Sequence, residues 1–153
     1  MKKPNKPKTI SNRRARHDYS IEDILTVGIQ LTGAETKALR HGHGNLRGAY
    51  VTLKDGELWL VNATISSMPG ITIEESQTTR SRKLLAHQRE INRLITTKQQ
   101  GRTIVPLDMI TQGRFIKLRI ASARGKKQYD KRQTIRQREE TRRTEQAIKM
   151  RRA

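Results

Sequence analysis

Histidine supplies the only side chains in this sequence that suit a soft metal ion, because cysteine is absent. His41 and His43 form a His-x-His pair beside two glycines, but no third ligand stands at a spacing typical of a metal site. His17 and His87 are isolated in the sequence. The pair therefore fits a polar loop of a basic protein better than a metal centre, and neither a metal nor another cofactor is expected.

The acidic residues and the glycines offer no pattern for catalysis either. Three pairs of acids are adjacent in the sequence, and neighbours along a strand point to opposite faces, so adjacency alone makes no acid–base dyad. These pairs are Glu22/Asp23, Glu74/Glu75 and Glu139/Glu140. The glycine-containing segment 42–45 is too short for a phosphate-binding loop, and there is no Gly-x-Ser-x-Gly elbow. The sequence therefore indicates a binding protein and not an enzyme.

The positive charge lies mostly at the two ends of the chain. The formal net charge is +19 for 153 residues, which points to a polyanionic partner. Residues 1–16 hold seven Lys/Arg and no acid, and residues 124–153 hold twelve against four acids. The segment 17–123 is closer to balance, with fourteen against ten. We therefore predict a disordered basic arm at 1–16, a folded domain at 17–123 and a basic tail at 124–153.

Several observations favour a nucleic acid over a membrane as the partner. No stretch approaches the roughly 20 apolar residues of a membrane span, and the N-terminus lacks the apolar segment of a secretory signal. No helix with a Trp/Phe/Leu face is apparent, so membrane binding is not expected and the cytoplasm is the expected compartment. The chain has one Trp, one Phe and three Tyr, too few for an aromatic platform. Binding should therefore depend on the phosphates, shape and 2′-hydroxyls of structured RNA.

The hydrophobic pattern predicts a mainly β domain with helices. A strand-like region at 19–31 is followed by Thr32 and Glu35, which fit a capping box at the start of a short helix that Gly42 and Gly44 end. Two hairpins are predicted, one across Asp55-Gly56 and one across Gln112-Gly113. Their strands are expected at 49–53 and 57–61, and at 103–109 and 114–123. The apolar stripe within 79–100 predicts the longest helix of the folded part. About six strands with two to three helices suit a small closed antiparallel barrel of the OB type.

The tail beyond Gly125 has the composition of a helix without a packing face. It holds no Gly or Pro from Lys126 onward, and most of its residues are good helix formers. Its few apolar residues make no continuous stripe, so nothing holds a helix here against the domain. We predict that the tail is disordered when free and helical when it is bound to RNA.

Blocks of residues from about 12 to the C-terminus resemble one known family. They are NRRARHDY at 12–19, GIQLTGAETKALR at 28–40, GHGNL at 42–46, TRSRKLL at 79–85, REIN at 89–92, VPL at 105–107 and ARGKKQYDKR at 123–132. In this order and spacing they are similar to the SsrA-binding proteins, also called small protein B. Each block alone would be a weak signal, whereas the series is specific.

The resemblance implies both a fold and a function. It implies an OB-type barrel that binds the tRNA-like domain of transfer-messenger RNA, and a tail that becomes helical in the empty mRNA channel of a stalled ribosome. It further implies action near the decoding centre of the small ribosomal subunit, together with elongation factor Tu and alanyl-charged transfer-messenger RNA. The chain is expected to act as a monomer.

The same resemblance assigns roles to individual residues. Those expected to bind transfer-messenger RNA are Glu35, Lys37, Arg40, Gly42, Asn45, Lys126 and Lys127. Those expected in the decoding centre and the mRNA channel are His17, Tyr129, Asp130, Lys131, Arg132, Arg136, Arg138, Arg142 and Arg143. Two of these roles have physical alternatives that stay open: Glu35 also fits the capping box, and Asp130 also fits an N-cap of the tail helix.

Some residues depart from the family pattern, and other functions are conceivable. His43-Gly44 replaces a more usual basic residue followed by Ala, which predicts a looser RNA-contacting loop. Gln77-Thr78 stands where Asp-Pro is common, and Met109–Thr111 replaces a Tyr-containing strand. The main alternative function is that of a basic ribosomal protein or assembly factor that binds rRNA. An rRNA-modifying enzyme would need a cofactor site or converging carboxylates.

Overall fold

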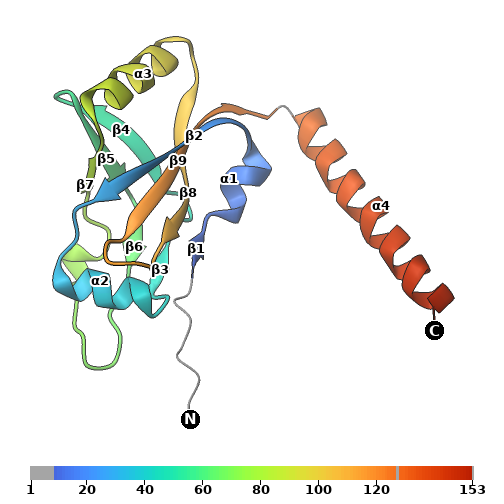
Figure 1. Ribbon diagram of the computed structural model, residues 1–153, viewed down its shortest axis with the longest axis horizontal. Helices are drawn as coiled ribbons and strands as arrows, with labels where there is room; N and C mark the ends of the chain where they lie inside the picture. Colours follow the sequence, from blue (N-terminus) through green and yellow to red (C-terminus); the bar gives the residue numbers. More distant parts are fainter. Residues whose placement is uncertain (1–8, 127, 153) are drawn as a thin grey trace.

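The fold is a strongly curved antiparallel sheet with helices at its margins (Figure 1). The computed structural model describes residues 9–126 and 128–152; at 128–131, 133, 134 and 152 it describes the backbone alone. Seven strands form the sheet in the order β1-β8-β9-β2-β7-β5-β4. They are β1 (Ile10–Ser11), β2 (Tyr19–Ile29), β4 (Tyr50–Lys54), β5 (Glu57–Val61), β7 (Arg82–Leu85), β8 (Thr103–Ile110) and β9 (Lys117–Gly125).

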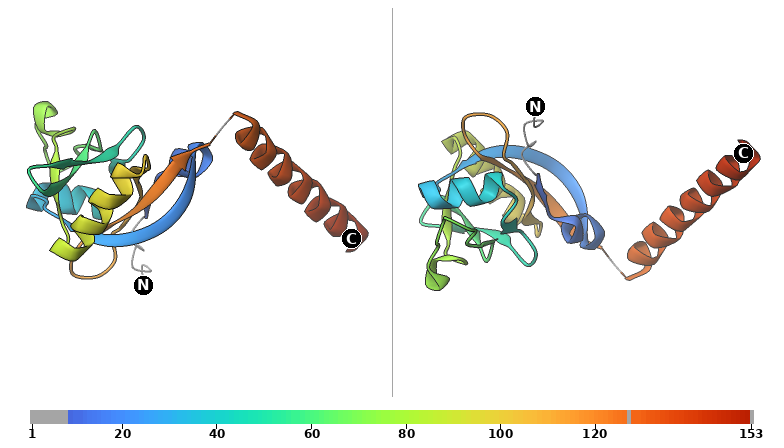
Figure 2. Two further views of the ribbon diagram at one scale, coloured as in Figure 1. Left: turned by 90° about the horizontal axis from the view of Figure 1, so that it is seen from above. Right: turned by 90° about the horizontal axis from the view of Figure 1, so that it is seen from below.

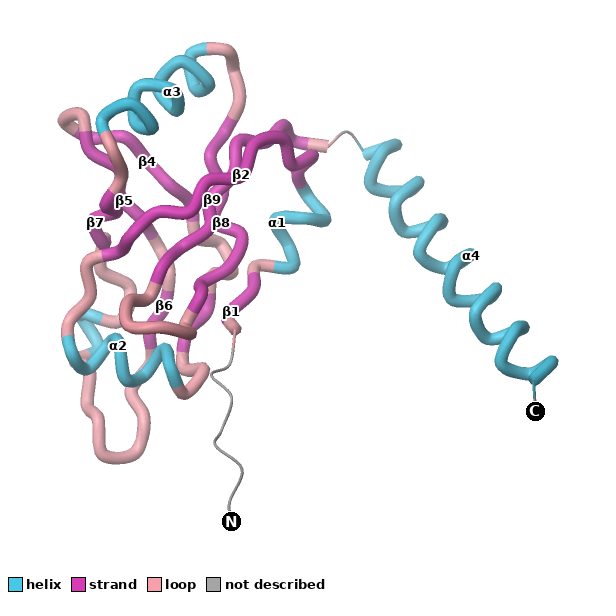
Figure 3. The backbone as a smooth tube through the Cα atoms, in the orientation of Figure 1, coloured by secondary structure: helices cyan, strands magenta, loops and turns pink. Residues whose placement is uncertain are grey.

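Two further short strands and five helical segments complete the architecture (Figure 3). The strands β3 (Gly44–Asn45) and β6 (Thr64–Ile65) pair with each other. The helices are α1 (Arg13–Asp18), α2 (Gly33–Arg40), the 3-10 helix Glu75–Gln77, α3 (Gln88–Gln99) and α4 (Gln128–Arg152). The mainly β fold of the OB type with helices is confirmed. The chain has more elements than predicted, because segments expected to be loop or arm form short strands and α1.

The long strand β2 organises the sheet because it pairs with β9 along most of its length and with β7 near its end. Its alternation places Val27 and Ile29 in the interior, where they meet the fully buried Leu58, Leu84 and Leu118. A register shift between Ile21 and Ile24 bends the strand, which helps the sheet to curl. The curl brings β4 close to β8, but among the described residues no ladder joins these two strands, so the barrel has an open seam here.

The hairpin across Asp55-Gly56 is confirmed. Asp55 and Gly56 have φ angles of 52° and 74°, so both central residues adopt the left-handed conformation. This is the backbone of a type I′ turn, whose twist matches that of the flanking strands. The pairing of Tyr50 with Val61 and of Leu53 with Leu58 fixes the register.

The predicted long helix at 79–100 is wrong in its first half. Residues Arg82–Leu85 form strand β7 in the middle of the sheet, and the helix α3 begins only at Gln88. The side chain of Arg82 is fully buried. His87, expected within the helix, precedes it, and its N–H donates to Glu90 Oε2 at 3.0 Å. Tertiary burial of Arg82 and Leu84 outweighs their helical propensity.

The predicted disordered arm at 1–16 is wrong for its described part, because residues 10–16 belong to the domain. Ile10 is buried and pairs with Met109 in β8. The N–H of Asn12 donates to the carbonyl of Leu107 at 2.7 Å. Ala15 of α1 is also buried. The segment docks through a buried apolar residue and a buried Asn. Neither residue is charged, so a division of the chain by net charge does not detect them. Residues 1–8 lie outside the described part of the chain.

The tail forms one helix, α4, of 25 residues that extends away from the sheet (Figure 2). Its side chains are exposed wherever they are described. No helix in the described part of the chain is long and apolar enough to cross a membrane. Residues 9–126 and 128–152 likewise contain no group of three or more His, Cys, Asp or Glu side chains that could hold a metal ion.

Candidate nucleic-acid interface

Helix α2 begins with the capping box that the sequence predicts. The N–H of Glu35 donates to Thr32 Oγ1 at 3.2 Å, and the N–H of Thr32 donates to Glu35 Oε1 at 3.1 Å. The cap fixes where the helix starts, and therefore where its later residues lie.

The carboxylate of Glu35 also binds two arginines that are distant from it in the sequence. It accepts hydrogen bonds from Arg80 and Arg82 and forms ion pairs with both. The side chain of Glu35 is only 2% exposed and that of Arg82 is 0% exposed. The segment leading into β7 is thereby fixed against the first turn of α2.

The pKa values of this pair follow from burial and from mutual hydrogen bonding. Burial alone would raise the pKa of Glu35, but the hydrogen bonds from Arg80, Arg82 and the Thr32 N–H outweigh it and hold that pKa below its ordinary value. Burial lowers the pKa of Arg82, and the carboxylate of Glu35 partly restores it. The lowered pKa keeps the Glu35 carboxylate ionised at neutral pH, opposite a guanidinium, a group that stays protonated in proteins.

Every N–H of the Arg82 guanidinium has an acceptor. Besides Glu35, it donates to the carbonyls of Ala63 at 2.9 Å, Arg80 at 3.1 Å, Gln77 at 3.3 Å and Thr78 at 3.1 Å. A buried charge is tolerated only when it is paired and hydrogen-bonded in this way. Sequence reasoning missed this residue, since nothing in the local pattern distinguishes it from the exposed bases around it.

The capping role of Glu35 is confirmed, whereas its direct contact with RNA stays a prediction. Its burial argues against that contact, because both carboxylate oxygens are engaged inside the protein. The geometry instead makes Glu35 the residue that positions α2.

Arg40 and Lys37, at the other end of α2, differ in what they can offer a ligand. The Arg40 guanidinium donates to the carbonyls of Thr111, Gly113 and Arg114 at 2.9–3.0 Å, and so holds the turn between β8 and β9. Lys37 is exposed. Of these two predicted RNA ligands, Lys37 has the side chain directed to solvent.

The loop after α2 is shaped by its glycines. Gly42 has a φ of 85°, a conformation that ends the helix and favours glycine. A Cβ at Gly44 would lie 2.5 Å from Leu39 Cδ2 and 2.8 Å from Ile10 Cδ1. Gly44 therefore permits close packing of Leu39 and Ile10 at this point, and the looser loop stays a prediction. Asn45 is exposed, and its Oδ1 accepts from the Arg47 N–H at 2.8 Å.

A second group of predicted residues lies where the domain meets the tail. Tyr19 pairs with Gly125, and the N–H of Lys126 donates to the carbonyl of Asp18 at 2.9 Å. Lys126 Nζ also donates to the carbonyl of Arg16 at 3.3 Å. His17 Nδ1 lies 3.0 Å from Asp18 Oδ1. We call this region, His17 to Tyr19 with Gly125 and Lys126, the tail junction.

The structure separates residues that the sequence analysis grouped together. Figures 1 and 2 place α2 and the tail junction at opposite ends of the domain. Lys126, which the resemblance groups with Lys37 and Asn45 as a ligand of transfer-messenger RNA, lies at the tail junction, where it donates to the carbonyls of Arg16 and Asp18. Lys127 lies outside the described residues.

The tail helix presents its arginines to solvent along its length. The exposed ones among the predicted set are Arg132, Arg136, Arg138, Arg142 and Arg143. The backbone at Tyr129, Asp130 and Lys131 is helical. Asp130 is the third residue of α4, so it is not the N-cap that one interpretation made it.

These features define a class of protein: a small, strongly basic OB-type β domain that continues into a long charged helix. A family model described as SmpB protein matches residues 9–150. The chain belongs to the SmpB family.

Its relatives and a solved structure agree with this assignment. An SsrA-binding protein of Roseiflexus sp. (strain RS-1) is 48% identical over 143 residues, which cover 92% of this chain and 90% of the relative. An SsrA-binding protein of Thermobifida fusca (strain YX) is 46% identical over 148 residues, covering 95% and 92%. A chain from the structure described as "tmRNA-SmpB: a journey to the center of the bacterial ribosome" is 39% identical with a TM-score of 0.65, covering 78% of this chain and 85% of that chain.

Proposed function

We propose that this protein binds transfer-messenger RNA with its folded domain and brings it to stalled ribosomes, where the tail recognises an empty mRNA channel. The observation that supports this most directly is the placement of α2 and the tail junction at opposite ends of one domain. A protein that joins two RNA partners needs two basic regions that do not compete for the same space.

The region around α2 is the proposed contact with the tRNA-like domain. Lys37 and Asn45 are exposed there, and the positive φ of Gly42 turns the backbone sharply between them. Exposed cations and closely approaching backbone suit phosphate and sugar contacts, which position an RNA without reading its bases. Glu35 and Arg40 support this surface from inside by fixing the two ends of α2.

The tail junction and α4 are the proposed contacts with the ribosome. A helix of 25 residues is ~37 Å long at 1.5 Å per residue, and its exposed arginines lie on more than one face. A helix without an apolar stripe fits a channel walled by RNA better than a protein groove. His17 and Tyr129 would meet bases of the decoding centre, and Asp130, Lys131 and Arg132 would enter the channel first.

The proposed function also includes a compartment and further partners. The protein would act as a monomer in the cytoplasm, with alanyl-charged transfer-messenger RNA and elongation factor Tu in the delivery complex. The tail would be disordered before it reaches the ribosome and helical within it, its ordering cost being offset by phosphate contacts.

Truncation after Lys126 tests whether the domain and the tail have separate functions. Binding to the tRNA-like domain should survive within a few fold, while peptide tagging on stalled ribosomes should be lost. Loss of both activities to the same degree would contradict the proposal. The full chain should also prefer transfer-messenger RNA over bulk tRNA and rRNA at two salt concentrations. A preference for rRNA would instead indicate a ribosomal protein or assembly factor.

A further inference from the structure

A groove lined by polar and basic residues lies where the start of α1 faces the loop that follows β3. Its volume is about 310 Å³. The residues that line it are Ser11, Asn12, Arg13, Arg14, Asn45 and Arg47. No acid is among these described residues, and the three arginines are exposed. We call this feature the arginine groove. Its lining suits a negatively charged ligand.

One wall of the arginine groove is the first turn of α1, which is held firmly to the sheet. The buried Asn12 donates to two carbonyls of β8, at 2.7 and 3.0 Å, and its Oδ1 accepts from the Ala15 N–H at 3.3 Å. Ala15 is buried as well and packs on β8 and β9. Arg13 and Arg14 lie between these two anchors and are exposed. Their backbone positions are therefore fixed before any ligand arrives.

The opposite wall is the loop that carries Arg47, and it is held by short local contacts. Leu46 is fully buried, and Asn45 Oδ1 accepts from the Arg47 N–H at 2.8 Å. A Cβ at Gly44 would lie 2.8 Å from Ile10 Cδ1, so the absence of a side chain lets β3 approach β1. Because β1 leads directly into α1, this approach sets the distance between the two walls.

The guanidinium groups of the arginine groove are available to a ligand. Other arginines of the domain already have acceptors inside it: Arg40 with carbonyls of the β8–β9 turn, Arg80 and Arg82 with Glu35, Arg102 with Glu22 and Arg119 with Asp108. Within the described part of the chain, the guanidinium groups of Arg13 and Arg47 have no hydrogen bond or ion pair. Arg14 Nε lies 3.5 Å from Asp18 Oδ2 with its side chain 62% exposed, and such an exposed pair is weak.

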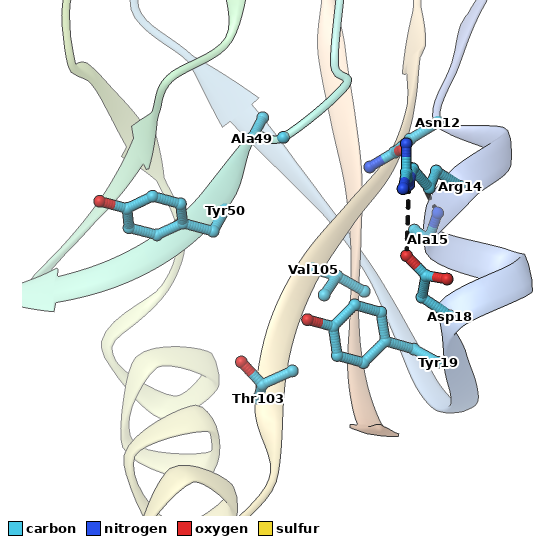
Figure 4. Close-up of a pocket in the computed structure, with 10 residues that line it drawn as sticks. Asn12, Arg14, Ala15, Asp18, Tyr19, Ala49, Tyr50, Thr103 and Val105 are labelled. Atoms are coloured by element: carbon cyan, nitrogen blue, oxygen red, sulfur yellow. Dashed lines mark hydrogen bonds and ion pairs between the residues drawn. The ribbon is translucent and has the colours of Figure 1, made fainter. Parts of the chain in front are cut away.

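The surroundings of the arginine groove favour phosphates over bases. A second groove, of about 250 Å³, adjoins it at the start of α1, where Asn12 and Arg14 line both. Figure 4 shows the ring of Tyr50 in this second groove directed away from that of Tyr19, so the residues drawn there form no slot for a base. Contacts with phosphates need no aromatic partner and carry no information about the sequence of the RNA.

We propose that the arginine groove binds consecutive phosphates of the RNA that the folded domain holds, with Arg13 and Arg14 on one wall and Arg47 on the other. A guanidinium stays protonated and can donate two parallel N–H bonds to phosphate oxygens. Asn45, which is predicted to contact transfer-messenger RNA, lines the same groove, so a strand bound there would continue toward α1. The proposal rests on the proposed RNA-binding function and adds three arginines to the residues expected to contact RNA.

The test removes the two arginines that have no partner in the protein, in the full-length chain. Arg13→Gln/Arg47→Gln should weaken binding to the tRNA-like domain by about 10- to 30-fold at roughly 0.15 M salt, because the counterions of two phosphates are no longer released. The slope of log affinity against log salt should fall by about 2. The control, Arg89→Gln/Arg93→Gln, removes the same charge from exposed positions on α3 and should keep the slope of the parent. Equal slopes for the two double variants would overturn the proposal.

Two further measurements examine the chemistry of the contact. Arg13→Lys/Arg47→Lys keeps both charges and should keep the slope of the parent. If this variant loses as much of the slope as the Gln variant, positive charge is not what the groove supplies, and the proposal is wrong. Inorganic phosphate should not bind the parent chain in calorimetry. Saturable binding that depends on the two arginines would instead assign the groove to a free anion.

The outcome for the arginine groove is separate from the outcome for the proposed function. If the parent chain prefers transfer-messenger RNA and Arg13→Gln/Arg47→Gln keeps its slope, only the groove is wrong. If the parent chain prefers rRNA and the same variant lowers the slope on rRNA, the groove is supported and the proposed function is not.

Discussion

The Glu35–Arg82 pair shows how a buried ion pair can fix the position of a helix and of the exposed residues that the helix carries. Its two charges are buried together, and each oxygen and nitrogen has a protein partner. Such pairs tolerate the loss of one member poorly, because the other charge is left buried and unpaired.

Arg82→Met should therefore destabilise the domain by about 3–5 kcal/mol, since it leaves Glu35 without its buried partner. Urea denaturation followed by Trp59 fluorescence would measure this. The control is Arg89→Met, an exposed base on α3, which should change the free energy of unfolding by less than ~0.5 kcal/mol. Equal effects of the two substitutions would show that the ion pair is not important for stability.

Acid should weaken the domain in part through Glu35. Its pKa is lower when folded than its ordinary value of 4.5, so its stabilising contribution is present above pH 4.5 and is lost as the pH falls through the folded pKa. The double variant Glu35→Gln/Arg82→Met removes both charges and should show a shallower loss of stability below pH 4.5. An unchanged slope of unfolding free energy against pH would contradict this assignment.

At the scale of elements, helix α2 and the β8–β9 turn form one unit through Arg40. Arg40→Ala removes three hydrogen bonds to the turn and should cost about 1 kcal/mol or more. Amides of residues 113–115 should exchange faster with solvent. The matched variant Lys37→Ala, on the same helix, should leave this exchange unchanged and weaken RNA binding instead. Faster amide exchange in both variants would contradict the assignment of a structural role to Arg40 and an RNA-contacting role to Lys37.

The N-terminal segment offers a second test at this scale. A chain that starts at residue 9 keeps Ile10 and Asn12 and serves as the reference. A chain that starts at residue 13 lacks Ile10 and Asn12, and should lose ~2–4 kcal/mol because a buried apolar side chain, the pairing of β1 with β8 and the three hydrogen bonds of Asn12 disappear. Thermal unfolding of the two chains would measure the difference. Equal stability would mean that β1 contributes nothing to the fold.

Local signals in the sequence predicted those elements that depend on local geometry. Thr32 with Glu35 fixes a helix start, and Asp55-Gly56 fixes a turn, because each works through neighbours in the chain. Strand β7 and the docked N-terminus depend on partners 47 and 94 residues away, Glu35 for Arg82 and Pro106 for Asn12. The hydrophobic periodicity of a short segment carries no information about such distant partners. Composition misplaced the start of the domain at residue 17, because Ile10 and Asn12 pack on β8 without any signal in the charge pattern.

At the scale of the whole molecule, charge is divided between a region that would hold one RNA and a tail that would enter another. Replacing Arg142 and Arg143 with Gln should weaken ribosome binding while leaving the affinity for the tRNA-like domain unchanged. The slope of log affinity against log salt should fall by about 1 for each phosphate that is no longer bound. Glu139→Gln/Glu140→Gln, one turn earlier, is the control and should not weaken ribosome binding. Parallel losses for both RNAs would show that the tail is not separate.

The continuity of β9 with the tail also has a mechanical consequence. This strand begins at Lys117, near the turn held by Arg40, and ends at Gly125, beside the tail junction. It is hydrogen-bonded to β2 on one side and to β8 on the other over most of its length. A pull on the tail along the strand axis would load both ladders in shear, so that many hydrogen bonds resist together and do not open one at a time. The tail is thus attached to a strand that is paired on both sides.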